Sequence, residues 1–240
     1  MEREKREQIE WLMTEKMDDW RRKVEGVELD DLRVNVFLAA AMDMKEPEQL
    51  IQWGVHQHLE RSLVTSFGFL IEKIALLVAD GETHRGQGGD IVVERDGKTY
   101  YIEIKSGTAS SNVKMMRNTS SAQATIKDEN GKESVVTVLG LTYGKPDEVF
   151  STMRSYYEGD ELLVGRNFWE FLADAPDAHR DVLDAIVNAR RNTFQGAETD
   201  DDEPSSLQEA MDLKVETLTD AWKREHGATL TYDTLTESFF

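Results

Sequence analysis

The stretch GGDIVVERDGKTYYIEIKSG, residues 88–107, decides the fold expected for this chain. Two runs rich in β-branched and aromatic residues, 90–95 and 98–105, flank the dipeptide Asp96-Gly97. An Asp-Gly pair between two such runs favours a tight β-hairpin turn, because both residues tolerate the positive φ that the turn requires. The sequence therefore predicts a hairpin that turns at Asp96-Gly97.

Three charged side chains are expected to converge at the open end of this hairpin. Glu103 and Lys105 are two residues apart on the second strand, so their side chains project from the same face. Counting outward from the turn places Asp90 opposite Glu103, and the Cβ atoms of such cross-strand partners lie about 4.5–5.5 Å apart. Two carboxylates at that separation can share one divalent cation, with the ammonium of Lys105 beside it.

The donor types in the chain indicate which metal this site would take. Two neighbouring carboxylates repel each other unless a cation lies between them. The chain has no cysteine, and His56 and His58 are two residues apart in an expected helix, so they point to different faces. Oxygen ligands alone favour Mg²⁺ over zinc. An ammonium at such a site would stabilise the negative charge that develops in phosphodiester hydrolysis.

The motif is similar to that of a known nuclease superfamily. Gly89-Asp90, a short hairpin and then Glu103-Ile104-Lys105 resemble the PD-(D/E)xK signature, with Gly89 in place of the usual proline. Within that superfamily the chain most resembles type II restriction endonucleases, over residues 68–172. The resemblance implies an α/β fold with a restriction-endonuclease-like core, a central mixed sheet flanked by helices, and additional N- and C-terminal helices.

The resemblance also implies roles for the site residues. Asp90 and Glu103 would bind Mg²⁺ together with the carbonyl of Ile104, and Lys105 would position the attacking water. The superfamily often carries an acidic residue on the helix before the hairpin, and Glu72 occupies that place. Glu72 would then hold or orient a second ion. A solvated glutamate on a helix surface is the alternative interpretation of Glu72.

Residues on both sides of the motif are expected to contact DNA. Basic side chains that follow the second strand interrupt an otherwise acidic protein, which suits contacts to phosphate groups. Simple solvation of these side chains is the alternative. The predicted DNA-binding residues are Arg85, Asn112, Lys114, Arg117 and Gln123.

Helical periodicity flanks the hairpin on both sides. Four helices are expected before it, over residues 3–24, 29–44, 50–64 and 69–79, with Gly81 as the C-cap of the last. After it we expect a polar helix over 110–126, a buried strand over 134–143, helices over 166–173, 178–190 and 207–225, and a short terminal helix. Helix, hairpin, helix and strand in this order indicate an α/β core.

The segments are expected to group into three consecutive regions within one compact domain. Residues 1–67 are expected to be a helical region for dimerisation or DNA contact, and residues 68–175 the catalytic core. Residues 176–240 form a helical C-terminal region, in which the charge run at 196–206 is expected to be an acidic linker.

The net charge of −19 opposes DNA binding if it is taken alone. The charge is unevenly distributed, since residues 84–127 hold seven basic and four acidic side chains. A polyanion is therefore expected to bind one face, while an acidic surface elsewhere keeps the protein soluble. A pervasive excess of Asp and Glu also suits a cytoplasm of high salt concentration.

No membrane segment is expected, because the longest apolar stretch covers only residues 74–79. Residues 1–7 carry mixed charge and no apolar region follows, so a secretory signal is not expected either. The sequence therefore predicts a cytoplasmic protein, and the lack of cysteine excludes disulfides.

The leading hypothesis is a type II restriction endonuclease that hydrolyses double-stranded DNA at a specific sequence with Mg²⁺. We expect a homodimer, because a two-fold symmetric site requires two matched active centres, and a cognate methyltransferase in the same system. One alternative is a DNA repair or structure-selective nuclease of the same superfamily. Another is a non-catalytic DNA-binding protein that retains the fold, in which the motif is an ordinary charged face.

Overall fold

The computed structural model describes residues 1–84, 86–108, 112–131, 133–149, 151–195 and 204–239. Arg85, predicted to contact DNA, and residues 196–203 of the predicted acidic linker lie outside the described residues. The chain divides into two compact units. The first, called the sheet unit, comprises Met1–Trp11 and Phe67–Val187, and the second, the helical unit, comprises Leu12–Ser66 and Asn188–Phe240. These units do not coincide with the three consecutive regions expected from the sequence, and the roles assigned to those regions stay predictions.

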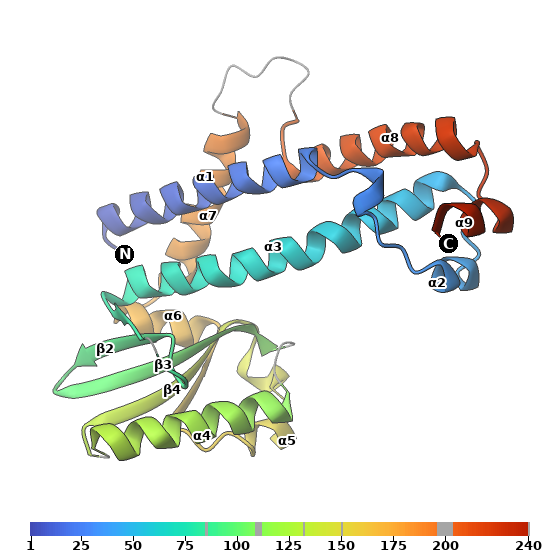
Figure 1. Cartoon of the computed structure of the whole chain (residues 1–240). Coiled ribbons are helices and arrows are strands. Elements are labelled where there is room, and N and C mark those ends of the chain that lie inside the picture. Colours follow the sequence, from blue (N-terminus) through green and yellow to red (C-terminus); the bar gives the residue numbers. More distant parts are fainter. Residues whose placement is uncertain (85, 109–111, 132, 150, 196–203, 240) are drawn as a thin grey trace. The chain divides into compact units, whose positions relative to one another are not determined.

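The sheet unit contains a five-stranded sheet in the order β1-β2-β3-β4-β5 (Figure 1). The first three strands pair antiparallel, and β3, β4 and β5 pair parallel, so the predicted mixed sheet is confirmed. The strands are β1 (Glu82–Thr83), β2 (Ile91–Arg95), β3 (Lys98–Gly107), β4 (Val135–Tyr143) and β5 (Glu161–Val164). The sequence analysis missed β1 and β5.

The β2–β3 hairpin forms as the sequence predicted. Asp96 and Gly97 have φ angles of 51° and 73°, the two positive values that a two-residue turn of this kind requires. Val92 pairs with Tyr101, as counted outward from that turn. The ladder extends to the pair of Ile91 with Ile102, so Asp90 lies immediately before its first strand.

Helices cover both faces of the sheet (Figure 1). On one face lies α4 (Val113–Asn130), whose Met116 belongs to a buried cluster with Leu139 and Leu141 of β4. On the other face lie α6 (Arg166–Ala173) and the end of α3 (Pro47–Ala79). A Cβ at Gly140 would come within 2.1 Å of the Phe168 ring of α6, so glycine permits this close approach.

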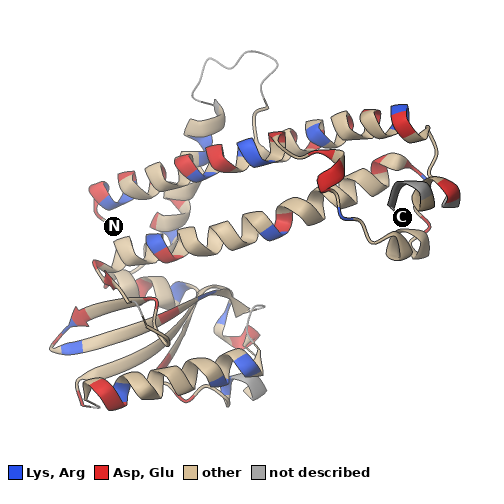
Figure 2. Ribbon diagram, in the orientation of Figure 1, with Lys and Arg blue, Asp and Glu red and all other residues tan. Residues whose placement is uncertain are grey.

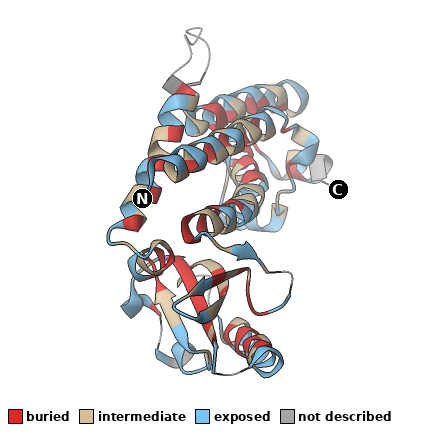
Figure 3. Ribbon diagram, turned by 90° about the vertical axis from the view of Figure 1, so that its left-hand side faces the viewer, coloured by how far each residue is buried: buried red, intermediate tan, exposed pale blue. Residues whose placement is uncertain are grey.

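The entry to the hairpin packs closely on α4. Gly88 has a φ of +90°, and a Cβ there would lie 2.9 Å from backbone atoms of Ala122 and Gln123. Both observations require glycine at this position. β4 is buried along most of its length, and Figure 3 shows buried residues within the sheet and along one side of the helices.

The helical unit is built around one apolar cluster. It contains residues of α1 (Arg3–Glu25), α2 (Val36–Ala41), α3, α8 (Leu207–His226) and α9 (Tyr232–Phe239), and η1 (Leu29–Asp31) is a single 3-10 turn. The buried cluster takes side chains from these helices, among them Val24, Ala39, Leu50, Val55, Leu59, Leu218, Trp222 and Leu235.

Two helical predictions before the hairpin were wrong in detail. The expected helix over 29–44 is split into η1 and α2, because Asn35 is extended and its side chain caps α2 by accepting from Leu38 N. The segments over 50–64 and 69–79 form one continuous helix, α3, since an isolated glycine such as Gly68 is tolerated in a helix. Its left-handed terminal residue is Asp80, with φ 50°, and not Gly81.

The helices after the sheet agree more closely with the sequence. The predicted helix over 166–173 is α6, and α7 (Ala178–Gln195) runs beyond the expected end at 190. The short segments η3 (Pro146–Glu148) and α5 (Ser151–Arg154) lie between β4 and β5.

Because α3 is continuous, it is long and apolar enough to cross a membrane by length and composition alone. This property was not expected from the sequence, in which residues 50–64 and 69–79 were predicted as two shorter helices. Core helices of soluble proteins pass the same test, so this property of α3 is weak evidence for a membrane span.

Candidate active site

The Asp90 carboxylate connects the two strands at the open end of the hairpin. Asp90 N donates to the Ile102 carbonyl at 2.7 Å, and Ile104 N donates to Asp90 Oδ2 at 2.6 Å. The side chain is therefore fixed by the backbone of the strand that carries Glu103, as the counted register required. Half-buried Asp90 lies at the end of the β2–β3 ladder and not within it.

Glu103 and Lys105 lie together on β3 and reach solvent. Lys105 Nζ is 2.6 Å from Glu103 Oε1, and the two side chains are 31% and 16% exposed. The same ammonium donates to the Ile104 carbonyl at 3.0 Å. Ile102 and Ile104 are buried on the opposite face of the strand, so the predicted alternation is confirmed.

Glu72 of α3 belongs to the same electrostatic cluster. Partial burial raises the pKa of Glu72, and the charge of Asp90 raises it further. Lys105 lowers this pKa and Glu103 raises it, so all four predicted catalytic side chains interact. Glu72, on the helix before the hairpin, is therefore within electrostatic range of the charged groups at the hairpin end.

The charge balance and the donor atoms fit a divalent cation. Burial raises the pKa of Asp90 and Glu103 adds to the effect, although the hydrogen bond from Ile104 and the charge of Lys105 oppose it. Ionisation of Asp90 is thus penalised by burial and, to a smaller extent, by the negative charge of Glu103, and a bound cation would offset both. Carboxylate and carbonyl oxygens are ligands that Mg²⁺ accepts. Within the described residues, however, Glu72, Asp90 and Glu103 do not form a group whose ligand atoms all lie within 4.8 Å of one another.

Sequence reasoning missed His84, which lies beside this cluster. His84 N donates to the Asp90 carbonyl at 3.0 Å, and the His84 ring meets the Tyr101 ring edge-on with 5.2 Å between centroids. Its charge lowers the pKa of Asp90. No sequence signal marked this histidine, because its proximity depends on the pairing of β1 with β2.

The predicted DNA-binding residues lie on α4 but differ in accessibility. Lys114 and Arg117 are exposed, and the Arg117 guanidinium lies over the Tyr156 ring at 4.5 Å. Asn112 is exposed and caps α4 by accepting from Met115 N at 2.9 Å. Gln123 is 1% exposed, donates to the Val138 carbonyl and accepts from the Tyr157 hydroxyl. Both ends of its amide are bound inside the protein, so we remove Gln123 from the DNA-binding set.

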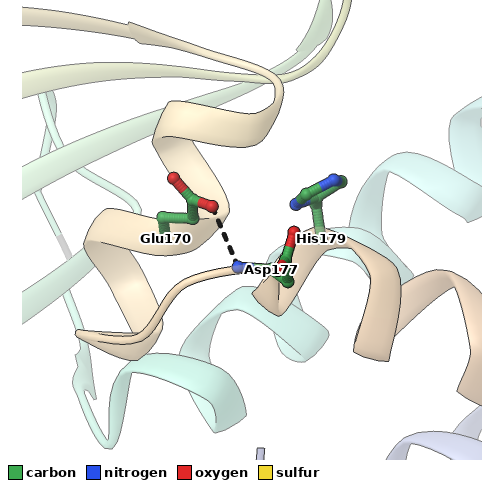
Figure 4. A group of neighbouring side chains, drawn as sticks. All are labelled: Glu170, Asp177 and His179. Carbon is green, nitrogen blue, oxygen red and sulfur yellow. Dashed lines mark hydrogen bonds between the residues drawn. The ribbon is translucent and has the colours of Figure 1, made fainter.

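A second cluster of potential ligands lies at the corner between α6 and α7. In the described part of the chain, Glu170, Asp177 and His179 bring their ligand atoms within 4.8 Å of one another (Figure 4). Glu170 Oε1 accepts from Asp177 N at 2.9 Å and from Arg166 Nε at 2.7 Å, and these contacts lower the pKa of Glu170. Asp177 also forms an ion pair with Arg180, with 3.6 Å between Asp177 Oδ1 and Arg180 Nε. The cluster is thus an ion-paired corner that already has its counterions.

The fold and the hairpin end define a class of protein. A five-stranded mixed sheet that carries Asp90 before one strand and Glu103-Ile104-Lys105 near the end of the next has the PD-(D/E)xK nuclease arrangement. The family model described as Type II restriction endonuclease EcoO109I matches residues 7–193, most of the chain. The chain therefore belongs to this restriction endonuclease family, which implies endonuclease activity. A comparison with curated proteins found no match.

Proposed function

We propose that this endonuclease hydrolyses phosphodiester bonds of double-stranded DNA at a specific sequence, with Mg²⁺ as its metal. The observation that carries the proposal is the convergence of Asp90, Glu103 and Lys105 at one hairpin end, with Glu72 electrostatically coupled to them. A non-catalytic charged face would not require a half-buried aspartate whose pKa is raised by burial and by the charge of Glu103.

Asp90 and Glu103, with the carbonyl oxygen of Ile104, would hold the metal, and Glu72 would hold or orient a second ion. When bound, Mg²⁺ would supply positive charge that lowers the pKa of the attacking water and stabilises negative charge on the phosphate oxygens. The Ile104 carbonyl accepts from Lys105, and Lys105 also pairs with Glu103. The Lys105 ammonium has three N–H donors, so one remains for a substrate while the other two contact these oxygens.

Lys105 would contribute to the reaction as a donor and as a positive charge. Hydrolysis forms a bond from a water oxygen to phosphorus and breaks a bond from phosphorus to an ester oxygen, which receives a proton. The Lys105 ammonium can orient the water through a hydrogen bond and stabilise the charge on the phosphorane-like transition state. Partial exposure of the side chain leaves it accessible to DNA.

DNA would be held by Lys114 and Arg117 on α4, with Asn112 at the start of the same helix. These residues follow the catalytic strand directly in the chain. We also propose a homodimer, which would place two active centres on the two strands of a symmetric site. A cognate methyltransferase would protect the host DNA at that site.

Plasmid cleavage tests the proposal. The wild-type protein should yield discrete fragments with Mg²⁺ and none with EDTA. Lys105→Ala should lower the cleavage rate by a factor of about 10² or more, since it removes an electrostatic contact made in the transition state. Lys98→Ala is the matched control, because Lys98 is an exposed lysine at the opposite end of the same strand. It should cleave at the wild-type rate.

The other outcomes discriminate between the alternatives. Smeared products or cleavage restricted to junctions would favour a repair or structure-selective nuclease. Binding without scission, under conditions where the protein is folded, would favour a non-catalytic DNA-binding protein. Equal rates for Lys105→Ala and Lys98→Ala would remove Lys105 from the mechanism.

A further inference from the structure

We propose that Thr142 of β4 is a positioning residue that holds the catalytic end of β3 in place for Lys105. This inference rests on the proposed function, and it concerns a buried group that contacts neither DNA nor the reacting atoms. The Thr142 hydroxyl donates to the carbonyl of Ser106, the residue directly after Lys105. Thr142 is 6% exposed and Ser106 is partly buried, so this hydrogen bond lies largely inside the protein.

The hydroxyl acts where the parallel ladder between β3 and β4 is about to end. Lys105 pairs with Leu141 and Gly107 pairs with Tyr143, which places the Ser106 carbonyl beside Thr142. β3 ends at Gly107, and strand ends are prone to fray, so a side-chain contact at this point would stabilise the strand end. A bond to the carbonyl next to Lys105 restricts the backbone from which the catalytic ammonium projects.

Thr142 is itself fixed by α6. The indole of Trp169, which is 4% exposed, donates through Nε1 to the Thr142 carbonyl at 2.8 Å. Gly165, the residue directly before α6, donates through its N–H to the Leu141 carbonyl, also at 2.8 Å. The hydrogen bonds thus run from Trp169 to Thr142, which is a buried bond, and from Thr142 to Ser106, which is partly buried. They transmit the position of α6 to the residue next to Lys105.

Precise placement of a catalytic group has a large effect on rate, because a displacement of about 1 Å can lower it by a factor of about 10². Lys114 and Arg117, which would hold the DNA, lie on α4 and take no part in these hydrogen bonds. Loss of the Thr142 hydroxyl should therefore lower kcat and leave DNA affinity unchanged. A merely structural role would lower stability without this split.

Thr142→Val tests the inference, because valine has nearly the same shape and lacks the donor. Thr137→Val is the matched control, since Thr137 is also buried on β4 and its hydroxyl contacts Asp160, at a part of the strand paired with Tyr101. Thr137→Val loses two hydrogen bonds, one to the carboxylate and one from the N–H of Asp160, whereas Thr142→Val loses one. The control should therefore lower the melting temperature at least as much as Thr142→Val. Thr142→Val should lower the single-turnover cleavage rate about tenfold, whereas Thr137→Val should stay within about threefold of wild type.

Two further measurements separate positioning from instability. Thr142→Ser retains the donor and should restore the rate to within about threefold of wild type. Hydrogen–deuterium exchange should become faster at residues 105–107 in Thr142→Val but not in Thr137→Val, which is a readout independent of activity. Trp169→Phe removes the indole donor at the other end of the hydrogen bonds and should also lower the rate.

The results distinguish this inference from the proposed function. If the wild-type protein does not cleave DNA with Mg²⁺, the proposed function fails. If the wild type cleaves and Lys105→Ala does not, the active site stands. Under that condition, equal rates for Thr142→Val and Thr137→Val, or equally slow cleavage by Thr142→Ser and Thr142→Val, would overturn the positioning role.

Discussion

At the scale of single residues, the site combines a carboxylate that resists ionisation with an ammonium that neutralises another carboxylate. Burial and the charge of Glu103 raise the pKa of Asp90, whereas Glu103 itself is paired with Lys105 at 2.6 Å. A side chain whose ionisation is disfavoured in the folded state reduces stability at neutral pH. It also becomes a better cation ligand, because binding removes the unfavourable charge.

We expect Asp90→Asn to make the stability of the folded protein less dependent on pH. The folded-state pKa of Asp90 is raised, so its contribution to stability is fully present below the ordinary aspartate pKa of about 3.9 and is lost as pH rises through the folded value. Asparagine keeps an acceptor for Ile104 N and has no charge to lose. Urea unfolding is measured from acidic to neutral pH, without divalent cations. The free energy of unfolding of the variant should increase relative to that of the wild type as pH rises.

The same variant should lose the response to metal. If 10 mM Mg²⁺ is ten times the dissociation constant, the wild type should gain about 1.4 kcal/mol of stability, since ligand binding stabilises the folded state. Asp90→Asn should gain much less, whereas Asp96→Asn, an exposed position at the turn of the same hairpin, should respond like the wild type. An equal rise in melting temperature for all three proteins would exclude Asp90 as a ligand.

At the scale of elements, α3 is one helix through both Gly54 and Gly68. A Cβ at Gly68 would meet no atom within 4 Å, and Gly68 is not among the glycines with positive φ. Gly68→Ala should therefore stabilise the protein by about 0.5–1 kcal/mol, because glycine has greater conformational freedom to lose in a helix. The midpoint of urea unfolding measures this change.

Gly54→Ala is the contrasting substitution in the same helix. Its Cβ would approach Val34 Cγ2 to 3.1 Å and Leu32 Cβ to 3.3 Å, so the gain in helix propensity is opposed by tight packing. We expect a smaller gain or a loss. If Gly68→Ala destabilised the protein more than Gly54→Ala, the continuous helix would be in doubt.

The elements that were predicted correctly are those whose structure is determined by residues close in sequence. The turn at Asp96-Gly97 sets the register of the hairpin, and the register sets which residues lie at its open end. By contrast, β5 has only four residues, and its position depends on pairing with β4, as in Leu139 with Leu162. A short apolar run of this kind has no periodicity that separates a strand from a helix.

The part of the site that depends on residues close in sequence was predictable, and the part that depends on long-range contacts was not. The alternation on β3 placed Glu103 and Lys105 on one face, because side chains alternate with a period of two. The sequence could not show that Gln123 is buried, since its partner Tyr157 lies 34 residues away in the chain. Polar residues near a motif are exposed or buried according to such long-range contacts.

At the scale of the whole molecule, acidic side chains are spread over the helices of both units (Figure 2). The net charge of −19 repels a polyanion at long range, so binding requires local positive charge. The exposed Lys114 and Arg117 on α4 are the positive charges that we propose for this role. Repulsion and local attraction are both screened by salt, and their balance decides how affinity depends on ionic strength.

We expect DNA affinity to fall as the NaCl concentration rises, because phosphate contacts release counterions from DNA. Lys114→Ala should weaken binding to all sequences alike and reduce the slope of log K against log [NaCl] by about one. Lys45→Ala is the control, since Lys45 is a comparably exposed lysine of the helical unit that pairs with Asp43. Fluorescence anisotropy with labelled duplexes, in Ca²⁺ in place of Mg²⁺ to prevent cleavage, gives both slopes. An affinity that rises with salt would mean that general repulsion dominates over these contacts, and it would support adaptation to a cytoplasm of high salt concentration. Unchanged slopes for Lys114→Ala would remove Lys114 from the proposed DNA-binding surface.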